Sequence, residues 1–127
     1  MNRKNSVLVL DDDPLMLRTW KRLLRHSYEV SAFDTVAAAI SHLETEGNHE
    51  RYTAVLCDLN LGDRDGVDFF EHAERKWPAL AKRIAFVTGG ATKPRQFAFL
   101  SRTANPVLEK PFGWDDALAL LDSIAIS

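Results

Sequence analysis

The chain has 127 residues, with 16 lysines and arginines against 18 aspartates and glutamates, which gives a net charge of −2. This length corresponds to one ordinary domain with a sizeable core, and the near balance of charge gives no reason to expect binding to nucleic acid or to an anionic membrane. The apolar runs are too short for a signal sequence or a membrane span, so we expect a cytoplasmic protein. The single cysteine, Cys57, cannot form an internal disulfide and is expected to be a small core residue.

Short apolar runs alternate with amphipathic helical patterns, and this alternation predicts an α/β domain with a parallel sheet covered on both faces. Pro14 suits the first turn of a helix, Asp34 or Thr35 can cap the next helix, and Pro78 stops the third. In chain order, the expected strands lie at 7–10, 28–32, 54–58, 84–87 and 107–108, and the expected helices at 14–27, 35–46, 66–77, 94–103 and 114–124.

The helix expected at 94–103 is the least regular, because Phe97 and Phe99 do not fit on one face together with Leu100. One of these rings is therefore expected to be exposed, where it would support a homodimer. The other large aromatic side chains are expected in the core, namely Trp20, Phe70, Trp77 and Trp114. The histidines share no metal-ligand spacing and are expected at the surface, namely His26, His42, His49 and His72.

Five strand-helix units with right-handed crossovers place ligand-binding loops at the carboxyl ends of the strands. The polar residues at those ends are Asp11, Asp12 and Asp13 after the first strand, Asp58 after the third, Thr88 after the fourth and Lys110 after the fifth. Converging carboxylates raise each other's pKa unless a cation lies between them. Two acids of the first loop can hold Mg²⁺, which leaves Asp58 as a nucleophile toward phosphorus. Lys110 would neutralise phosphoryl oxygens, and the Thr88 hydroxyl would donate to the attached phosphate.

These residues lie in motifs that resemble one known family, the receiver domain of two-component response regulators, with its CheY-like fold. The matching segments are Val7-Leu8-Val9-Leu10-Asp11-Asp12-Asp13-Pro14, Leu56-Cys57-Asp58-Leu59-Asn60-Leu61 through Asp65-Gly66, Phe86-Val87-Thr88-Gly89, and Glu109-Lys110-Pro111-Phe112. Each motif alone is weak. Together they are in register at the strand ends and cover the chain nearly end to end.

The resemblance implies a doubly wound (βα)5 domain whose parallel sheet has the order 2-1-3-4-5, as one receiver domain over 1–127 without an output domain. It implies that Asp58 is the phosphoacceptor, with Mg²⁺ held by Asp11, Asp12, Asp58 and the backbone carbonyl of Asn60. Thr88 matches the switch hydroxyl, and Lys110 matches the phosphate-contacting lysine, whose bond to Pro111 is usually cis.

The resemblance also implies the partners and the class of activity. A histidine kinase or a histidine phosphotransfer protein would donate the phosphoryl group, and a downstream protein would read the face made by the fourth helix, the fifth strand and the fifth helix. Such a domain is a signalling module rather than an enzyme acting on an external metabolite.

Two positions depart from the family pattern. Gly62 stands where the family commonly has proline, and Val107 stands where an aromatic residue often lies three residues before the lysine. A switch made of Thr88 and an aromatic ring is therefore not expected in its usual form. The Gly89-Gly90 pair and the segment from Pro94 resemble receivers attached to hybrid sensor kinases. A stand-alone regulator, a phosphorelay intermediate and a part of a longer kinase all stay open.

Two other functions compete with this interpretation. The first is a pseudo-receiver that binds a partner without phosphorylation. The second is a haloacid-dehalogenase-like phosphatase, whose nucleophile motif resembles Asp11-x-Asp13 but has Thr or Val where Leu15 stands. Asp13 is expected to cap the helix that begins at Pro14. The remaining acids of the loop after Asp58 are expected in a solvated loop and helix start, namely Asp63, Asp65 and Asp68.

Overall fold

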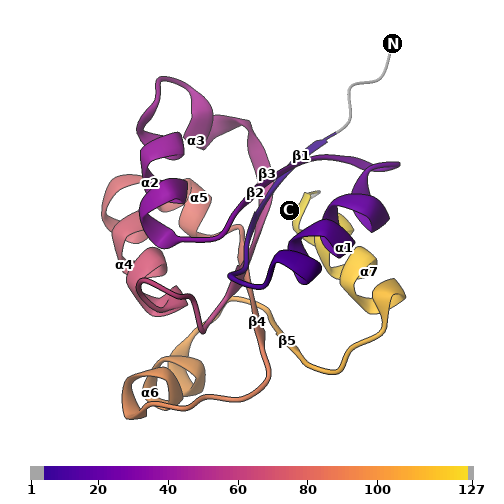
Figure 1. Cartoon of the computed structure of the whole chain (residues 1–127). Helices are drawn as coiled ribbons and strands as arrows, with labels where there is room; N and C mark the ends of the chain where they lie inside the picture. The colour runs from indigo at the N-terminus through magenta and orange to yellow at the C-terminus, as the bar shows by residue number, and fades with distance from the viewer. Residues whose placement is uncertain (1–4, 126–127) are drawn as a thin grey trace.

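The computed structural model describes residues 5–125 of the chain. Its strands are β1 (Asn5–Leu10), β2 (Tyr28–Phe33), β3 (Tyr52–Asp58), β4 (Ile84–Thr88) and β5 (Val107–Glu109). Its helices are α1 (Pro14–Leu24), α2 (Val36–Glu44), α3 (Asn48–Arg51), α4 (Gly66–Lys76), α5 (Pro78–Ala81), α6 (Pro94–Arg102) and α7 (Trp114–Ala125). In Figure 1 the strands form a central sheet between two layers of helices.

All strand pairs of the sheet are parallel, and the order is β2-β1-β3-β4-β5. The predicted fold class and strand order are therefore confirmed. Helices α1 and α7 cover one face, and α2, α4, α5 and α6 cover the other (Figure 1). No helix among residues 5–125 is long and apolar enough to cross a membrane.

Two hydrophobic cores lie on the two faces of the sheet, because alternate residues of a strand point to opposite sides. In β1, Leu8 and Leu10 belong to the core beneath α2 and α4, whereas Val7 and Val9 belong to the core beneath α1 and α7. The central strands are buried on both faces, which explains why they are near-continuous apolar runs in the sequence. Cys57 is fully buried in the first of these cores, as predicted.

The two single-turn helices α3 and α5 were not predicted. The sequence places helix ends at Gly47 and Pro78, but a new helical turn begins directly after Gly47 and at Pro78 itself. Gly47 adopts φ of 79°, a left-handed conformation that glycine takes without the steric penalty of a side chain. Trp77 has an extended φ of −136° and separates α4 from α5, so that Pro78 ends one helix and starts the next. Helix α1 ends at Leu24, before the predicted Ser27.

The aromatic residues are mostly placed as predicted. Trp20 and Trp77 are buried and Phe70 is half-buried, but Trp114 is 36% exposed, so its assignment to the core was wrong. Trp114 is the first residue of α7 and packs edge-on against Trp20 and Phe112. On α6, Phe99 is buried and Phe97 is 60% exposed, which confirms the expectation that one of these rings would be exposed.

The histidine prediction was only partly right, because His26 is exposed and the other three histidines are half-buried. The Nε2 atom of His42 lies 2.6 Å from the Tyr52 hydroxyl. His49 and His72 pack against Trp77. Periodicity could not predict these positions, because each ring packs against an aromatic side chain, either Tyr52 or Trp77.

Candidate functional site

The carboxyl ends of the strands bring the predicted polar residues to one edge of the sheet. In the register of the sheet, Leu10 of β1 pairs with Cys57 of β3, so that Asp11 and Asp58 follow at the same level. Asp58 of β3 pairs in turn with Val87 of β4, which directly precedes Thr88. Lys110 follows β5, and its backbone N–H donates to the Thr88 carbonyl oxygen at 2.8 Å.

Asp58 and Lys110 form the central contact of this edge. The Lys110 Nζ lies 3.0 Å from Asp58 Oδ2, and the Asp58 carboxylate is buried. Burial lowers the pKa of Lys110, but the hydrogen bond to Asp58 and the charges of the nearby acids outweigh it, so the net shift is upward. Lys110 is therefore cationic at neutral pH. The Lys110–Pro111 bond is cis, as the resemblance implied.

Asp11 is the other buried carboxylate of the site. Its pKa is raised, first by burial and then by the charges of Asp58 and Asp12, while the Asp13 N–H and the Lys110 charge act in the opposite direction. The Asp13 N–H donates to Asp11 Oδ1 at 3.0 Å. At this edge the carboxylates of Asp11, Asp12 and Asp58 face the single ammonium of Lys110, and an additional cation would relieve the repulsion.

The donor set suits Mg²⁺, because it consists of carboxylate and carbonyl oxygens at an edge with excess negative charge. Asp12 is exposed, and its Oδ2 lies 3.9 Å from the point where a Cβ on Gly62 would be. Within residues 5–125, no three His, Cys, Asp or Glu side chains already form a metal-holding group. That is compatible with Mg²⁺, which keeps several waters and commonly binds one or two carboxylates.

The segment after Asp58 forms a closed loop. The Asn60 N–H donates to Asp58 Oδ1 at 2.9 Å, and Asn60 pairs with Asp65 in an isolated antiparallel bridge. The loop then packs tightly on β3 at Gly66, where a Cβ would lie only 2.6 Å from the Asp58 backbone oxygen. Glycine is required there by this close approach. The loop thus holds one oxygen of the candidate acceptor in place.

Thr88 is buried at the end of β4, beside the Lys110 backbone. Its Oγ1 accepts a hydrogen bond from the Gly90 N–H at 2.9 Å. Because a hydroxyl group is both a donor and an acceptor, this bond leaves the Thr88 proton available to another oxygen. Gly89 keeps the space next to Lys110 open, since its nearest contact for an added Cβ is Lys110 Cδ at 3.9 Å.

The acids after Asp58 are not simply solvated, so this prediction was wrong in part. Asp65 is buried and forms a reciprocal capping box with Asp68 at the start of α4. Asp63 accepts hydrogen bonds from Val36 N–H and Ala37 N–H at the start of α2. The Asp65-x-x-Asp68 spacing was a visible capping signal. By contrast, no pattern in the sequence indicates that Asp63 caps a helix so far from it in the chain.

The sequence predicts Asp13 as the cap of α1 and either Asp34 or Thr35 as the cap of α2, and the structure confirms Asp13 and shows Thr35 in the second case. Asp13 accepts from the Leu15 N–H at 2.9 Å and caps α1, and Thr35 accepts from the Ala38 N–H at 3.1 Å and caps α2.

Another side chain near the site, Gln96, has no signal in the sequence. This residue of α6 is fully buried and donates to Asn60 Oδ1 at 3.0 Å.

The five-stranded parallel sheet of order 2-1-3-4-5, with acids and a lysine at its carboxyl edge, defines a domain of the CheY-like class. The model of the response regulator receiver domain family matches residues 7–122, and the chain belongs to this family of signalling domains. It spans only about a fifth of the length of one curated relative and about half of the length of another.

Two curated relatives illustrate this membership. The two-component response regulator ORR26 of Oryza sativa subsp. japonica is 32% identical over 107 residues, which cover 82% of this chain and 18% of the relative. The transcriptional regulatory protein BasR of Escherichia coli K12 is 28% identical over 120 residues, which cover 94% of this chain and 51% of the relative.

Two solved structures share the fold. A CheY-like receiver domain protein of Methanospirillum hungatei JF-1 has a TM-score of 0.82 and 25% identity, and the match covers 98% of this chain and 95% of that one. The receiver domain of a sensor histidine kinase of Pseudomonas aeruginosa PAO1 has a TM-score of 0.82 and 22% identity, over 98% of this chain and 100% of that one. The latter structure has a magnesium ion coordinated in its active-site cleft.

Proposed function

We propose that Asp58 accepts a phosphoryl group from the phosphohistidine of a histidine kinase or a histidine phosphotransfer protein, with Mg²⁺ as cofactor. The observation that carries this proposal is the buried Asp58 carboxylate, ion-paired with Lys110 at 3.0 Å beside Asp11. Membership of the receiver family and the magnesium ion in the Pseudomonas receiver support it. The chain acts as a cytoplasmic signalling module on its own carboxylate, not as an enzyme on an external metabolite.

The transfer exchanges one bond at phosphorus for another. An oxygen of Asp58 attacks phosphorus, the new P–O bond forms, and the P–N bond to the donor imidazole breaks with its electron pair returning to the ring nitrogen. Lys110 is charged before the reaction and contacts the attacking carboxylate, so its ammonium can pair with the phosphoryl oxygens as they arrive.

The acids of the site would hold the metal. These ligands are Asp11, Asp12, Asp58 and the backbone carbonyl of Asn60. When bound, Mg²⁺ supplies positive charge beside the transferred phosphoryl group. The raised pKa of Asp11 supports this assignment, because it comes first from burial and then from the charges of Asp58 and Asp12, and a cation beside Asp11 would favour its charged form.

The acyl phosphate would act as the switch. It adds negative charge and acceptor oxygens at Asp58, and the Thr88 hydroxyl can donate to one of them while still accepting from the Gly90 N–H. Movement there would alter the face made by α6, β5 and α7, which we propose is read by a downstream protein or a second copy of the chain. Phe97 is the large exposed apolar side chain of α6 on which such a contact can centre.

Intact-mass spectrometry after incubation with acetyl phosphate tests the proposal. We expect one added phosphoryl group that requires Mg²⁺ and is lost in Asp58→Asn, a variant that keeps the size of the side chain. Labelling that persists in Asp58→Asn would overturn the site assignment. Absence of both an adduct and a beryllium fluoride complex would instead indicate a phosphorylation-independent binding domain.

A further inference from the structure

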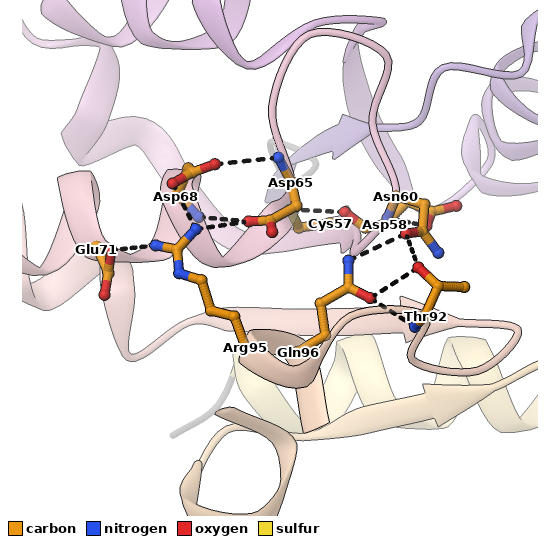
Figure 2. Close-up of polar contacts among 9 residues, drawn as sticks. All are labelled: Cys57, Asp58, Asn60, Asp65, Asp68, Glu71, Thr92, Arg95 and Gln96. Atoms are coloured by element: carbon orange, nitrogen blue, oxygen red, sulfur yellow. Dashed lines mark hydrogen bonds and ion pairs between the residues drawn. The ribbon is translucent and has the colours of Figure 1, made fainter. Parts of the chain in front are cut away.

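Gln96 on α6 is a fully buried polar side chain that lies outside the predicted site. Its Oε1 accepts from the Thr92 N–H at 2.8 Å and lies 3.3 Å from the Thr92 hydroxyl, and its Nε2 donates to Asn60 Oδ1 at 3.0 Å. Figure 2 shows this amide between Thr92 and Asn60. Both ends of the amide are thus engaged, as is usual for polar groups in a protein interior.

The direction of these hydrogen bonds follows from chemistry. A backbone N–H can only donate, so the Gln96 atom that faces the Thr92 N–H must be the amide oxygen. The amide nitrogen then faces Asn60, and the Asn60 atom that receives it must be an oxygen. One backbone group of the segment before α6 therefore determines the orientation of both amides.

The contact continues to the candidate phosphoacceptor. Asn60 accepts from Gln96 through its side chain and donates to Asp58 Oδ1 through its backbone N–H, at 2.9 Å. Two hydrogen bonds therefore connect α6 with the Asp58 carboxylate, on the side opposite Lys110. The other face of α6 is exposed to solvent, as Phe97 shows. The two hydrogen bonds therefore join an outer surface of the domain to the candidate phosphoacceptor.

The neighbouring residue, Arg95, holds the other end of the same loop. Its guanidinium contacts Asp65 at 3.4 Å and Asp68 at 2.7 Å, and it also pairs with Glu71 of α4 (Figure 2). Arg95 is substantially exposed, and ion pairs of this kind contribute little individually. Gln96, in contrast, is fully buried. We therefore expect the loop to be affected more by loss of the Gln96 contact than by loss of the Arg95 ion pairs.

We propose that Gln96 is a positioning residue for phosphoryl transfer to Asp58, which it serves by holding Asn60. This inference rests on the proposed function. Asn60 then donates its N–H to Asp58 Oδ1 in a constant geometry. The phosphorylation state of Asp58 is thereby coupled to the position of α6. Val107 stands where an aromatic switch residue would lie, so this amide contact gives the domain a route to its outer surface that needs no aromatic ring. Coupling of this kind is reciprocal, so a change at α6 alters the reactivity of Asp58.

The test is Gln96→Met, which keeps the length of the side chain and removes both hydrogen-bonding groups. With acetyl phosphate as donor, we expect phosphorylation to slow by about 2- to 10-fold, the effect of one net hydrogen bond on a barrier. In an Asn60→Ala background the same substitution should have no further effect, because the contact is already absent. The Mg²⁺-dependent rise in Tm, which needs no turnover, should require more Mg²⁺ in Gln96→Met than in the native chain.

Two further variants separate positioning from folding. Thr92→Val removes an exposed hydroxyl that contacts Gln96 and Asn60, so it should fold normally and show a smaller slowing. Arg95→Ala on the same helix loses ion pairs to Asp65, Asp68 and Glu71 but no contact to Asn60, so phosphorylation should slow less than in Gln96→Met.

The outcomes distinguish this inference from the proposed function. Slower phosphorylation in Gln96→Met that disappears in the Asn60→Ala background supports the inference. Native rates in both Gln96→Met and Thr92→Val, or effects that simply add to that of Asn60→Ala, overturn it while the proposed function stands. Failure of the native chain to take up phosphate overturns the proposed function and this inference together.

Discussion

The two oxygens of the Asp58 carboxylate are held in different ways. Oδ2 faces the Lys110 ammonium, which reaches across from the end of β5, whereas Oδ1 accepts from the Asn60 N–H within the same loop. The lysine contact is a charge on a flexible stem that can follow an incoming phosphoryl group. The Asn60 contact is part of a closed backbone loop that is tied to α6. One side of the carboxylate is therefore adjustable and the other is rigid.

The rigid side should respond most strongly in stability. Gly66→Ala places a Cβ 2.6 Å from the Asp58 backbone oxygen and 3.1 Å from Leu59 Cα, so the loop must move away from β3. We expect a loss of about 3 kcal/mol in the free energy of unfolding, measured by urea denaturation. Gly62→Ala in the same loop is the control, because its added Cβ meets only Asp12 Oδ2 at 3.9 Å. Equal stability of the two variants would contradict the tight packing of the loop on β3.

The adjustable side should show a smaller loss of stability and a larger loss of signalling. Lys110→Met leaves the buried Asp58 carboxylate without its counter-ion, and we expect a loss of about 1–2 kcal/mol at neutral pH. The double variant Asp58→Asn/Lys110→Met should recover most of this loss, because no charge then remains unpaired. In Lys110→Met, beryllium fluoride should cause a smaller change in hydrogen exchange at α6, β5 and α7 than in the native chain. This response should be reduced more than the labelling by acetyl phosphate.

A native response of hydrogen exchange in Lys110→Met would show that the lysine only neutralises charge during transfer. In that case the Asn60 side of the carboxylate would carry the signal alone. The chemistry would then belong to Oδ2 and the signalling to Oδ1.

Asp11 is the second buried carboxylate at this edge of the sheet. Burial and the charges of Asp58 and Asp12 raise its pKa, so the folded state favours the protonated form, and its effect on stability becomes unfavourable as pH rises from the unfolded value of 3.8 through the folded value. Without Mg²⁺ at neutral pH, Asp11→Asn should therefore be more stable than the native chain, by on the order of 1 kcal/mol.

Asparagine at position 11 retains an oxygen for the Asp13 N–H, so the loop geometry is preserved. Thermal unfolding with and without Mg²⁺ measures the effect, and saturating Mg²⁺ should stabilise the native chain more than the variant. A variant that is less stable than the native chain in metal-free buffer at pH 7, and gains equally from Mg²⁺, would remove Asp11 from the proposed metal site.

The sequence predicts the adjustable side of Asp58 better than the rigid side. Asp11, Asp58 and Lys110 follow apolar runs, and parallel strands bring such positions to one edge whatever the detailed packing. Gln96 has no comparable signal, since a single glutamine in an irregular helix is indistinguishable from a solvated residue until α6 is placed against the loop. Its burial depends on a contact between segments 36 residues apart, which periodicity does not encode.

The same reasoning explains the errors in the predicted fold. Trp114 carries the apolar surface of a core residue, but the first turn of α7 lies at the rim of the domain, where one side of the ring meets solvent. Helix α3 follows Gly47 and α5 begins at Pro78, and both residues end helices in general. At these two positions local signals predicted that a helix stops, and the packing of the next segment decided whether a new turn began.

The smallest predicted effect concerns the far end of the rigid loop, where Asp63 caps α2. Its carboxylate accepts from the Val36 and Ala37 N–H groups, and these bonds overcome the opposing effect of burial and lower its pKa. Since the folded pKa is depressed, the stabilisation is fully present above the unfolded value of 3.8 and is lost as pH falls through the folded value. Asp63→Ala should cost about 0.5–1 kcal/mol at pH 7, and this difference should shrink below pH 4.

Urea denaturation of both chains across this pH range measures the Asp63 effect, and Asp34→Ala is the neighbouring control, since Asp34 is exposed and Thr35 provides the other cap of α2. A pH-independent difference would show that Asp63 acts by packing rather than by its charge. The other outcome is a difference that follows the predicted pH dependence while the rate of Asp58 phosphorylation stays native. In that case Asn60 and Gly66 make the loop rigid, and the hydrogen bonds of Asp63 to α2 contribute only to the stability of the fold.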